Sequence, residues 1–458
     1  MNEKPMNRNM VLFVTTASSF LNPFMSSSIN VALPVIGKAF SMNAILLSWV
    51  STSFLLASAM FLVPFGRIGD IYGRKKIFLA GMAVYTISSF ICGISVSSYM
   101  LIAFRVLQGV GSTMVFATSV AILLSVFPPE LRGKALGINV TGVYSGIMMG
   151  PFAGGILTQH FGWSSIFYIN ILFGVVIIAL ALYVFRGEWA EAQGEKVDYA
   201  GFLVYCIAIP AVMYGISIIP DTSGFWLTGG GLAVFGVFLW IESRVGQPLV
   251  NLALFKNRVF TLSNVAALIN YSATFAIGFL ISLYLQYIKG MSPQAAGIVL
   301  VSQPVIMTIF SPLAGSLSDR VSPGILASAG MALTTIGLFL FVFLGTGTPV
   351  WYIVAVLMMI GMGFALFSSP NTNAVMGSVE KRYFGLASAI IGTMRLLGMM
   401  LSMGIIMIVF TMVIGRVEIS PHNYGDFLVS LKTAFLISAI ICFAGIFPSM
   451  VRGRTSEK

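Results

Sequence analysis

Fourteen long apolar runs constrain what this chain can fold into more than any other feature does. A helix of about 20 residues crosses the hydrocarbon core of a bilayer. Only 9% of the 458 residues are charged, whereas soluble domains carry about 25% charged residues. The sequence therefore predicts an all-α integral membrane protein, embedded in a lipid bilayer. We place its spans near residues 11–32, 46–65, 77–94, 99–123, 136–157, 164–185, 200–219, 225–241, 261–287, 296–315, 324–344, 350–370, 386–414 and 429–450.

Positive charges are distributed unevenly over the connections between these spans. Most of the 25 lysines and arginines lie in the even-numbered connections and the two tails, and Arg105 and Arg395 lie within spans. Cytoplasmic loops carry such an excess of Lys and Arg. We therefore expect a multi-pass protein of the cell (plasma) membrane with both termini in the cytoplasm. The net charge of +11 is then a topology signal, because a nucleic-acid partner would need the cations on one folded soluble face.

Groups suited to catalysis or metal binding are not evident in the sequence. The three cysteines, Cys92, Cys206 and Cys442, lie far apart inside apolar runs, and no spacing suits a metal site or a disulfide. We find no nucleophile–base pair. We therefore expect a protein that is not an enzyme and that holds no metal or cofactor.

A short charged turn, Gly66 to Lys76, separates the second and third runs. Its glycines allow two helices to approach and turn sharply. Asp70 lies among four Lys and Arg residues, Arg74 included, where a carboxylate can pair with a cation or cap a neighbouring helix. A membrane hairpin with a basic cytoplasmic loop would carry similar charge. The spacing G-x-x-x-D-x-x-G-R-K, however, resembles the signature between the second and third helices of the major facilitator superfamily.

The fourth span opens with a cation inside the membrane, Arg105. Such a residue is costly in lipid and is a functional hypothesis by default, with snorkelling to an interface as the alternative. The pattern R-x-x-Q-G at Arg105, Gln108 and Gly109 resembles the superfamily's fourth-helix motif. In that motif the arginine is implicated in proton coupling.

Four glycines recur at every fourth residue of the fifth span, from Gly142 to Gly154. A ridge without side chains lets another helix approach backbone to backbone, and Pro151 would bend the span. Static packing alone would also explain the ridge. The stretch 146–155 is similar to a motif of the superfamily's exporters, so we expect the ridge at the interface between two helical bundles.

A polar stripe that includes Asn22, Ser26 and Asn30 runs along the first span. Polar side chains in a span face other helices or a water-filled path, and hydrogen bonds between packed helices would use them equally well. The end of this span, residues 29–34, resembles the first helix of the fourteen-helix drug:proton antiporters. Where those relatives carry an aspartate, this chain has Met25.

This resemblance implies a major facilitator fold with two six-helix bundles at residues 1–185 and 243–458. A linker loop and two inserted central helices would occupy 186–242. The stretch 315–320, which includes Asp319, follows the tenth span much as the charged turn follows the second. Internal repeats of this kind place a site between two bundles in secondary transporters.

The same resemblance implies roles for individual residues. A gating or conformational role is expected for Gly66, Asp70, Gly73, Arg74, Gly146, Gly150, Pro151, Gly154 and Gly155, and a coupling role for Arg105. The substrate cavity is expected to be lined by Asn22, Ser26, Asn30, Gln108, Asn270, Tyr271, Gln303 and Arg395.

The function implied is that of a secondary active transporter, working as a monomer. It would export small amphipathic or drug-like molecules by alternating access, with the proton as coupling ion. All 14 carboxylates lie outside the middle of the spans, whereas a proton-coupled cation exporter keeps an acid in the membrane interior. Export of neutral or anionic metabolites is therefore the alternative. A non-transporting sensor or scaffold is a remote one, because it would need a soluble domain to signal through.

Overall fold

The computed structural model describes residues 7–190, 192–194, 198–245, 252–318, 320–380 and 384–451. Asp319 of the weaker repeat lies outside them. Over the described residues the chain is helical and forms no β-strand. The α-helices are α1 (Arg8–Ala39), α2 (Ala44–Tyr72), α3 (Arg74–Gly93), α4 (Ser98–Val126), α5 (Pro129–Phe161), α6 (Ser165–Val184), α7 (Tyr199–Ile218), α8 (Thr222–Glu242), α9 (Arg258–Thr274), α10 (Ile277–Leu283), α11 (Pro293–Leu317), α12 (Pro323–Phe341), α13 (Val350–Gly377), α14 (Phe384–Val413) and α15 (Tyr424–Val451). Two 3-10 helices, η1 (Leu252–Lys256) and η4 (Pro421–Asn423), and a π-helix, η2 (Tyr284–Ile288), complete them.

These helices confirm the predicted all-α membrane fold. Among the described residues, thirteen helical segments are long and apolar enough to cross a membrane, and one of them combines α9, α10 and η2. The long helix missing from that set is α1, because its polar stripe lowers its mean hydropathy. With α1 included, one helical segment corresponds to each predicted run.

Residues of the ninth span form three pieces instead of one helix. α9 ends at Thr274, α10 begins at Ile277, and the π-helix η2 follows. At the break, the backbone N–H of Ala276 donates to the hydroxyl of Ser402 in α14 at 3.2 Å. Hydrocarbon offers no partner to a freed backbone group, so such a break is tolerated only where the protein supplies one.

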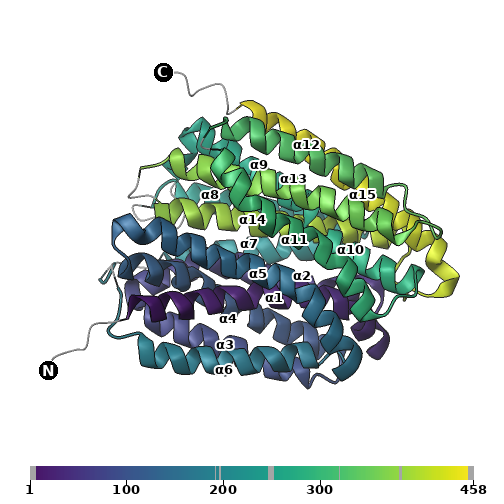
Figure 1. Cartoon of the computed structure of the whole chain (residues 1–458), viewed down its shortest axis with the longest axis horizontal. Coiled ribbons are helices and arrows are strands. Elements are labelled where there is room, and N and C mark those ends of the chain that lie inside the picture. The colour runs from purple at the N-terminus through teal and green to yellow at the C-terminus, as the bar shows by residue number, and fades with distance from the viewer. Residues whose placement is uncertain are drawn as a thin grey trace.

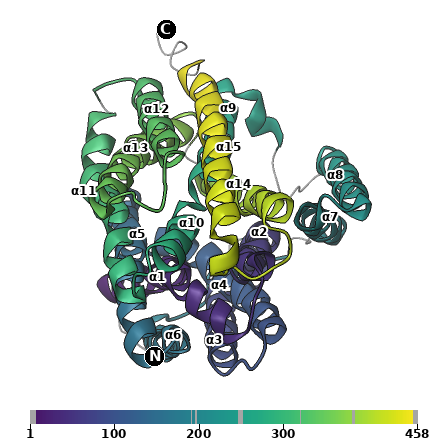
Figure 2. The same ribbon diagram turned by 90° about the vertical axis from the view of Figure 1, so that its right-hand side faces the viewer.

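Two groups of helices lie side by side (Figure 1). The N-terminal group, α1 to α6, and the C-terminal group, α9 to α15, meet where α5 packs on α11 and where α2 packs on α14 (Figure 2). The pair α7–α8 lies outside both groups, beside α2 and α14 (Figure 2). α1 begins and α15 ends at the same end of the molecule (Figure 1). We call this the proximal end and the opposite one the distal end.

The glycine ridge of α5 packs inside the N-terminal group, against α1. A Cβ atom added at Gly146 would lie 2.5 Å from the carbonyl oxygen of Phe20, and Gly142, Gly150 and Gly154 face α1 at similarly short range. We expected this ridge at the interface between two bundles, and that expectation is wrong for these four glycines. Their missing side chains instead let two helices of one group touch backbone to backbone.

Pro151 and Gly155 lie on another face of α5, which meets α11 of the C-terminal group. A Cβ atom added at Gly155 would lie 2.7 Å from the carbonyl oxygen of Pro293, and Gly297 of α11 abuts the carbonyl group of Pro151. These residues of the predicted motif therefore do lie between the two groups.

We expect Gly146→Ala to lower the melting temperature, because its Cβ would force α1 away from α5. Overpacking of this kind costs about 1–3 kcal/mol. Gly137→Ala on the same helix is the matched control, since an added Cβ there meets nothing within 4 Å and alanine favours the helix. Thermal melting of the purified protein in detergent checks both. Equal melting temperatures would contradict the packing described.

Candidate functional site

An ion pair organises the charged turn between α2 and α3. Nη2 and Nε of Arg74 lie 2.7 Å and 2.8 Å from Oδ1 of Asp70. The Arg74 side chain is 9% exposed and that of Asp70 34%, so the pair is partly shielded from solvent. Gly73, between the two helices, has a φ of +115°, a conformation that residues with a Cβ atom rarely adopt. The sharp turn therefore depends on this glycine.

Arg74 also ties the turn to α4. Its Nη1 donates to the hydroxyl of Ser125 at 2.5 Å and to the carbonyl oxygen of Ala121 at 3.4 Å. These partners belong to the N-terminal group, as Asp70 does. The pair thus braces one group of helices in this structure, and its expected role as a gate stays a prediction.

The segment after α6 closes over the same turn. One carboxylate oxygen of Glu188 accepts hydrogen bonds from the backbone N–H groups of Lys75 at 2.7 Å and of Trp189 at 3.3 Å. The N–H of Arg74 donates to the carbonyl oxygen of Trp189 at 2.9 Å. Glu188 thereby places a negative charge at the N-terminus of α3, where the helix dipole favours it, and its side chain fills the space beside Gly73. We call residues 186–190 the Glu188 strap.

Sequence reasoning missed Glu188 as a partner of the turn. The two are separated by 113 residues, and no spacing within the chain relates them. The available signal was chemical: a carboxylate soon after a span end can reach an exposed helix N-terminus on the same membrane face.

Arg105 of α4 is 1% exposed and lies inside the N-terminal group. Its Nε donates to the carbonyl oxygen of Val50 at 3.0 Å, and its Nη1 donates to Oε1 of Gln108 at 2.6 Å. Gln108 in turn donates to the hydroxyl of Ser89 at 2.7 Å. The guanidinium carbon lies 4.4 Å from the ring centre of Phe54. This burial rules out snorkelling, and Gln108 is part of the network that holds Arg105.

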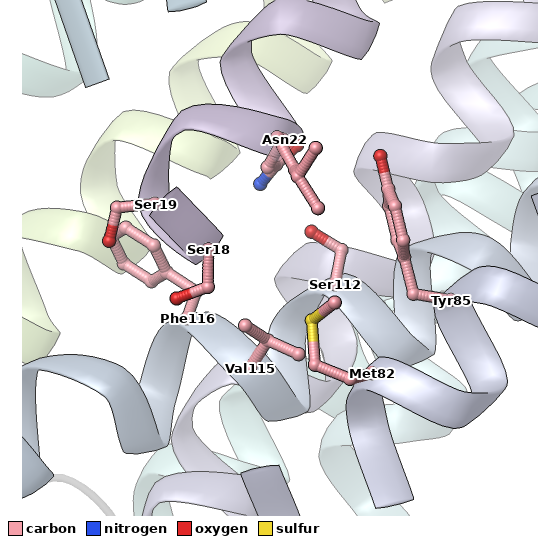
Figure 3. Close-up of a pocket in the computed structure, with 9 residues that line it drawn as sticks. Ser18, Ser19, Asn22, Met82, Tyr85, Ser112, Val115 and Phe116 are labelled. Carbon is pink, nitrogen blue, oxygen red and sulfur yellow. The ribbon is translucent and has the colours of Figure 1, made fainter. Parts of the chain in front are cut away.

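A narrow pocket lies between α1, α3 and α4 (Figure 3). It has room for about one water molecule, which is too little for an organic substrate. Asn22, predicted to line the cavity, is one of its residues. The hydroxyl of Ser112 here is buried without a hydrogen-bond partner in the described part of the chain. The lining residues are Ser18, Ser19, Leu21, Asn22, Met82, Tyr85, Ser112, Val115 and Phe116.

Other predicted cavity residues of the polar stripe and of α11 are half-buried. Asn30 faces the C-terminal group, because its side-chain nitrogen would lie 3.4 Å from a Cβ added at Gly278 of α10. Ser26 lies one turn earlier on α1. Gln303 lies in α11, and its backbone carbonyl packs against Gly361 of α13, where an added Cβ would approach to 2.5 Å.

Hydrogen bonds join the two groups at the distal end. Gln286 in the π-helix donates from Nε2 to the carbonyl oxygen of Val31 in α1 at 2.9 Å. The backbone N–H of Gln294 at the start of α11 donates to Oε1 of Gln159 in α5 at 3.2 Å. These bonds hold the two groups together there, and in this sense we call the distal end closed. Gln159 and Gln294 were not predicted, because polar residues are common at the ends of spans.

An aromatic and methionine cluster lies between the groups near the middle of the spans. It consists of the buried Tyr271, Met307 and Phe364, with the partly buried Tyr144 and Met399 against them. The rings of Tyr271 and Phe364 meet edge to face at 5.4 Å. Tyr144 comes from α5, so both groups contribute. Methionine and aromatic side chains together give adaptable apolar contact.

Arg395 of α14 borders this aromatic–methionine cluster. Its guanidinium carbon lies 5.6 Å from the ring centre of Tyr271, and its Nη2 donates to the hydroxyl of Thr372 at 2.8 Å. Its Nε is buried and has no hydrogen-bond partner among the described residues. Leaving a buried donor unsatisfied costs about 1–3 kcal/mol. A ligand that accepted a hydrogen bond from this Nε would remove that cost.

Asn270 precedes Tyr271 in α9 and is fully buried. Within the described ranges neither its amide nitrogen nor its amide oxygen has a hydrogen-bond partner. Buried polar groups are nearly always paired in native proteins. Asn270 therefore brings both donor and acceptor capacity into the membrane interior, and its place in a substrate cavity stays a prediction.

Carboxylates that the structure describes lie at helix ends or in connections. Asp70 is in the last turn of α2, Asp198 caps α7, Glu242 is the last residue of α8 and Asp426 is in the first turn of α15. None of the described carboxylates lies in the middle of a span. The groups available for recognition there are cationic, amide and aromatic.

Comparison with known proteins places this geometry in context. The sequence matches the family model described as Major Facilitator Superfamily over residues 15–403 and again over 263–458. The riboflavin transporter RibZ of Clostridioides difficile (strain 630) is 29% identical over 449 residues, which cover 98% of each chain. The multidrug resistance protein Stp of Mycobacterium tuberculosis (strain CDC 1551 / Oshkosh) is 29% identical, covering 86% of this chain and 74% of Stp. A solved bacterial homologue of the human lysosomal transporter Spinster shares the fold, with a TM-score of 0.74 at 16% identity over 99% of this chain and 98% of that one.

Gly73→Ala should detach the Glu188 strap. The added Cβ would meet the Glu188 side chain, and a positive φ costs alanine about 1–3 kcal/mol. Faster tryptic cleavage after Arg186 and a lower melting temperature are the expected results. Gly66→Ala is the matched control, since nothing lies within 4 Å of a Cβ there. If both variants resisted trypsin as the parent does, the strap would not depend on Gly73.

Proposed function

The chain belongs to the Major Facilitator Superfamily, and on this premise we propose that it exports small amphipathic, drug-like molecules by alternating access. It is a multi-pass membrane transporter and not an enzyme. The observation that carries the proposal is the aromatic–methionine cluster, to which both groups contribute. A solute held there would lose contacts with one group whenever the groups separated.

We propose that residues 1–185 and 243–458 move as two units, with 186–242 between them. The bonds inside the N-terminal group support this, because the glycine ridge and the Arg105 network join its helices through buried contacts. Between the groups, α5 packs on α11 and α2 packs on α14, and hydrogen bonds such as that of Gln286 join them at the distal end. The Arg105 network lies away from these faces, so the groups can separate without breaking it.

Direction and topology are part of the proposal. The positive charges favour both termini in the cytoplasm of a cell membrane, which makes the proximal end cytoplasmic and the closed distal end external. The exporter-type stretch 146–155 and the multidrug resistance protein among the relatives favour outward transport. In this scheme Asp70 and Arg74 gate the cytoplasmic side, Arg105 contributes to coupling, and a single chain suffices.

Protons are the proposed coupling ion, on the strength of the fourth-helix motif. Because no described carboxylate lies in mid-span, the proton would bind at a group other than a central acid. Substrate-driven pH change in proteoliposomes tests the coupling separately from transport.

Transport of neutral or anionic molecules is a second candidate, favoured by Arg395 and Asn270. The spare Nε of Arg395 and the unpaired amide of Asn270 suit a flat solute with hydrogen-bond acceptors, and Tyr271 and Phe364 offer its rings a surface. RibZ, similar over nearly its whole length, is named for riboflavin, a flat molecule of this kind.

Dye accumulation in expressing cells tests export. Cells with the wild-type protein should accumulate less of several amphipathic dyes than cells with Asp70→Asn, in which the ion pair with Arg74 is broken. Asp426→Asn is the control, since it neutralises an exposed carboxylate in the first turn of α15 and should transport like wild type. Equal accumulation in all three strains, at equal expression, would refute export of these dyes.

Arg395→Gln should weaken binding of anionic aromatic ligands on the order of 10-fold to 100-fold, since a hydrogen bond to a charged group contributes about 1.5–3 kcal/mol. Quenching of flavin fluorescence, with riboflavin and its phosphate ester against a cationic dye, measures it. Arg258→Gln, which removes an exposed arginine at the start of α9, is the control. Unchanged affinity for the phosphate ester in Arg395→Gln would remove the arginine argument.

A further inference from the structure

The inserted pair α7–α8 is attached to the N-terminal group along the length of α7. Near the proximal end the rings of Phe202 and Phe61 meet at 5.9 Å. In the middle, the buried hydroxyl of Tyr205 donates to the carbonyl oxygen of Ala59 in α2 at 3.0 Å. Near the distal end the rings of Tyr214 and Trp49 lie 6.4 Å apart. α7 therefore follows α2 from one membrane face to the other.

α7 also packs on α14 of the C-terminal group, with Met213 and Ile216 of its distal half against Gly404. Ile216 packs against Gly404 of α14, where an added Cβ would lie 2.9 Å from Cγ2 of Ile216, and Met213 lies beside the same glycine. Just beyond α7, Asp221 and Arg416 form an ion pair at 2.8 Å. Both of these side chains are half exposed, so the ion pair is weak and contributes less than the packing at Gly404.

α8 is held to α7 by close backbone packing. A Cβ atom added at Gly224 would lie 2.8 Å from the carbonyl oxygen of Gly215, and one at Gly231 would lie 2.7 Å from the backbone nitrogen of Val212. α8 lies on the far side of α7 from α2 and α14 (Figure 2). The two inserted helices therefore form one body.

We propose that α7–α8 is a clip that moves with the N-terminal group and grips α14 at the distal end, so that it favours the state closed there. This rests on the alternating access proposed above. When the distal end opens, α2 and α7 stay together while Ile216 leaves Gly404.

Distances between paired spin labels test the clip without any solute. Labels at Ser223 and Glu418 report on the clip against the C-terminal group, and labels at Ser223 and Ala39 report on it against the N-terminal group. All three positions are exposed, and Cys92, Cys206 and Cys442 are replaced by alanine. Two variants weaken the contact in opposite ways. Gly404→Val adds a side chain that clashes with Ile216, and Ile216→Ala removes the side chain that packs on Gly404.

The expected result is a new, longer Ser223–Glu418 distance in both variants, with the Ser223–Ala39 distance unchanged. Two results would overturn the clip: a Ser223–Ala39 distance that lengthens in step with the other, or a Ser223–Glu418 distance that neither variant changes. The monodispersity of each purified variant shows that it is folded.

Tethering the same pairs in cells connects the clip to transport. A short bifunctional thiol reagent across Ser223→Cys and Glu418→Cys should abolish dye export until a reductant cleaves it, whereas the tether across Ser223→Cys and Ala39→Cys should leave export intact. Export that survives the first tether contradicts the clip. If no dye is exported by any form while the label distances behave as expected, the proposed function fails and the clip stands.

Discussion

Hydrocarbon gives a polar group no hydrogen-bond partner, and this constraint determines where the chain can place its few charges. The guanidinium of Arg105 finds its partners inside the N-terminal group: a backbone carbonyl, the amide of Gln108 and the ring of Phe54. Asp70 and Arg74 pair with each other at a helix end, where Arg74 also donates to the hydroxyl of Ser125. Arg395 is only partly satisfied: its Nη2 donates to Thr372, but its Nε is buried without a partner among the described residues. Arg105 is thus held by three buried protein groups, whereas the Nε of Arg395 has no such partner.

Apolar helices in lipid gain no hydrophobic free energy by associating, so close packing has to join them. The chain does this with glycines of different orientation on one helix. Gly146 and its neighbours on the ridge lock α5 to α1, whereas Gly155 meets α11 of the other group. One face of α5 therefore packs within the N-terminal group, and another face of the same helix contacts the C-terminal group. The pair α7–α8 uses the same device internally, at Gly215 and Gly224.

Composition and run length were enough to predict the helical fold, because a run of apolar residues in lipid has one satisfactory backbone structure. The motif residues were also found, since Asp70 and Arg74 are four residues apart and pair within one local turn. The direction of the glycine ridge was not predictable, because spacing defines a helix face but not which neighbour it meets. Glu188 and the grip of Ile216 on Gly404 were missed for the same reason: their partners are distant in the chain, and only the assembled bundle brings them together.

The ninth span is not one continuous helix, because its backbone hydrogen bonding is interrupted at Ala276. An intact helix transmits tilt from one membrane face to the other, because each turn is bonded to the next. Here the N–H of Ala276 is held by a side-chain hydroxyl of α14 instead, a bond that contributes about 0.5–1.5 kcal/mol. The backbone hydrogen bonding is therefore interrupted between the distal piece that carries Gln286 and the piece that carries Asn270 and Tyr271. Joining the two groups at the distal end and contributing to the aromatic–methionine cluster thus fall to different pieces of one span.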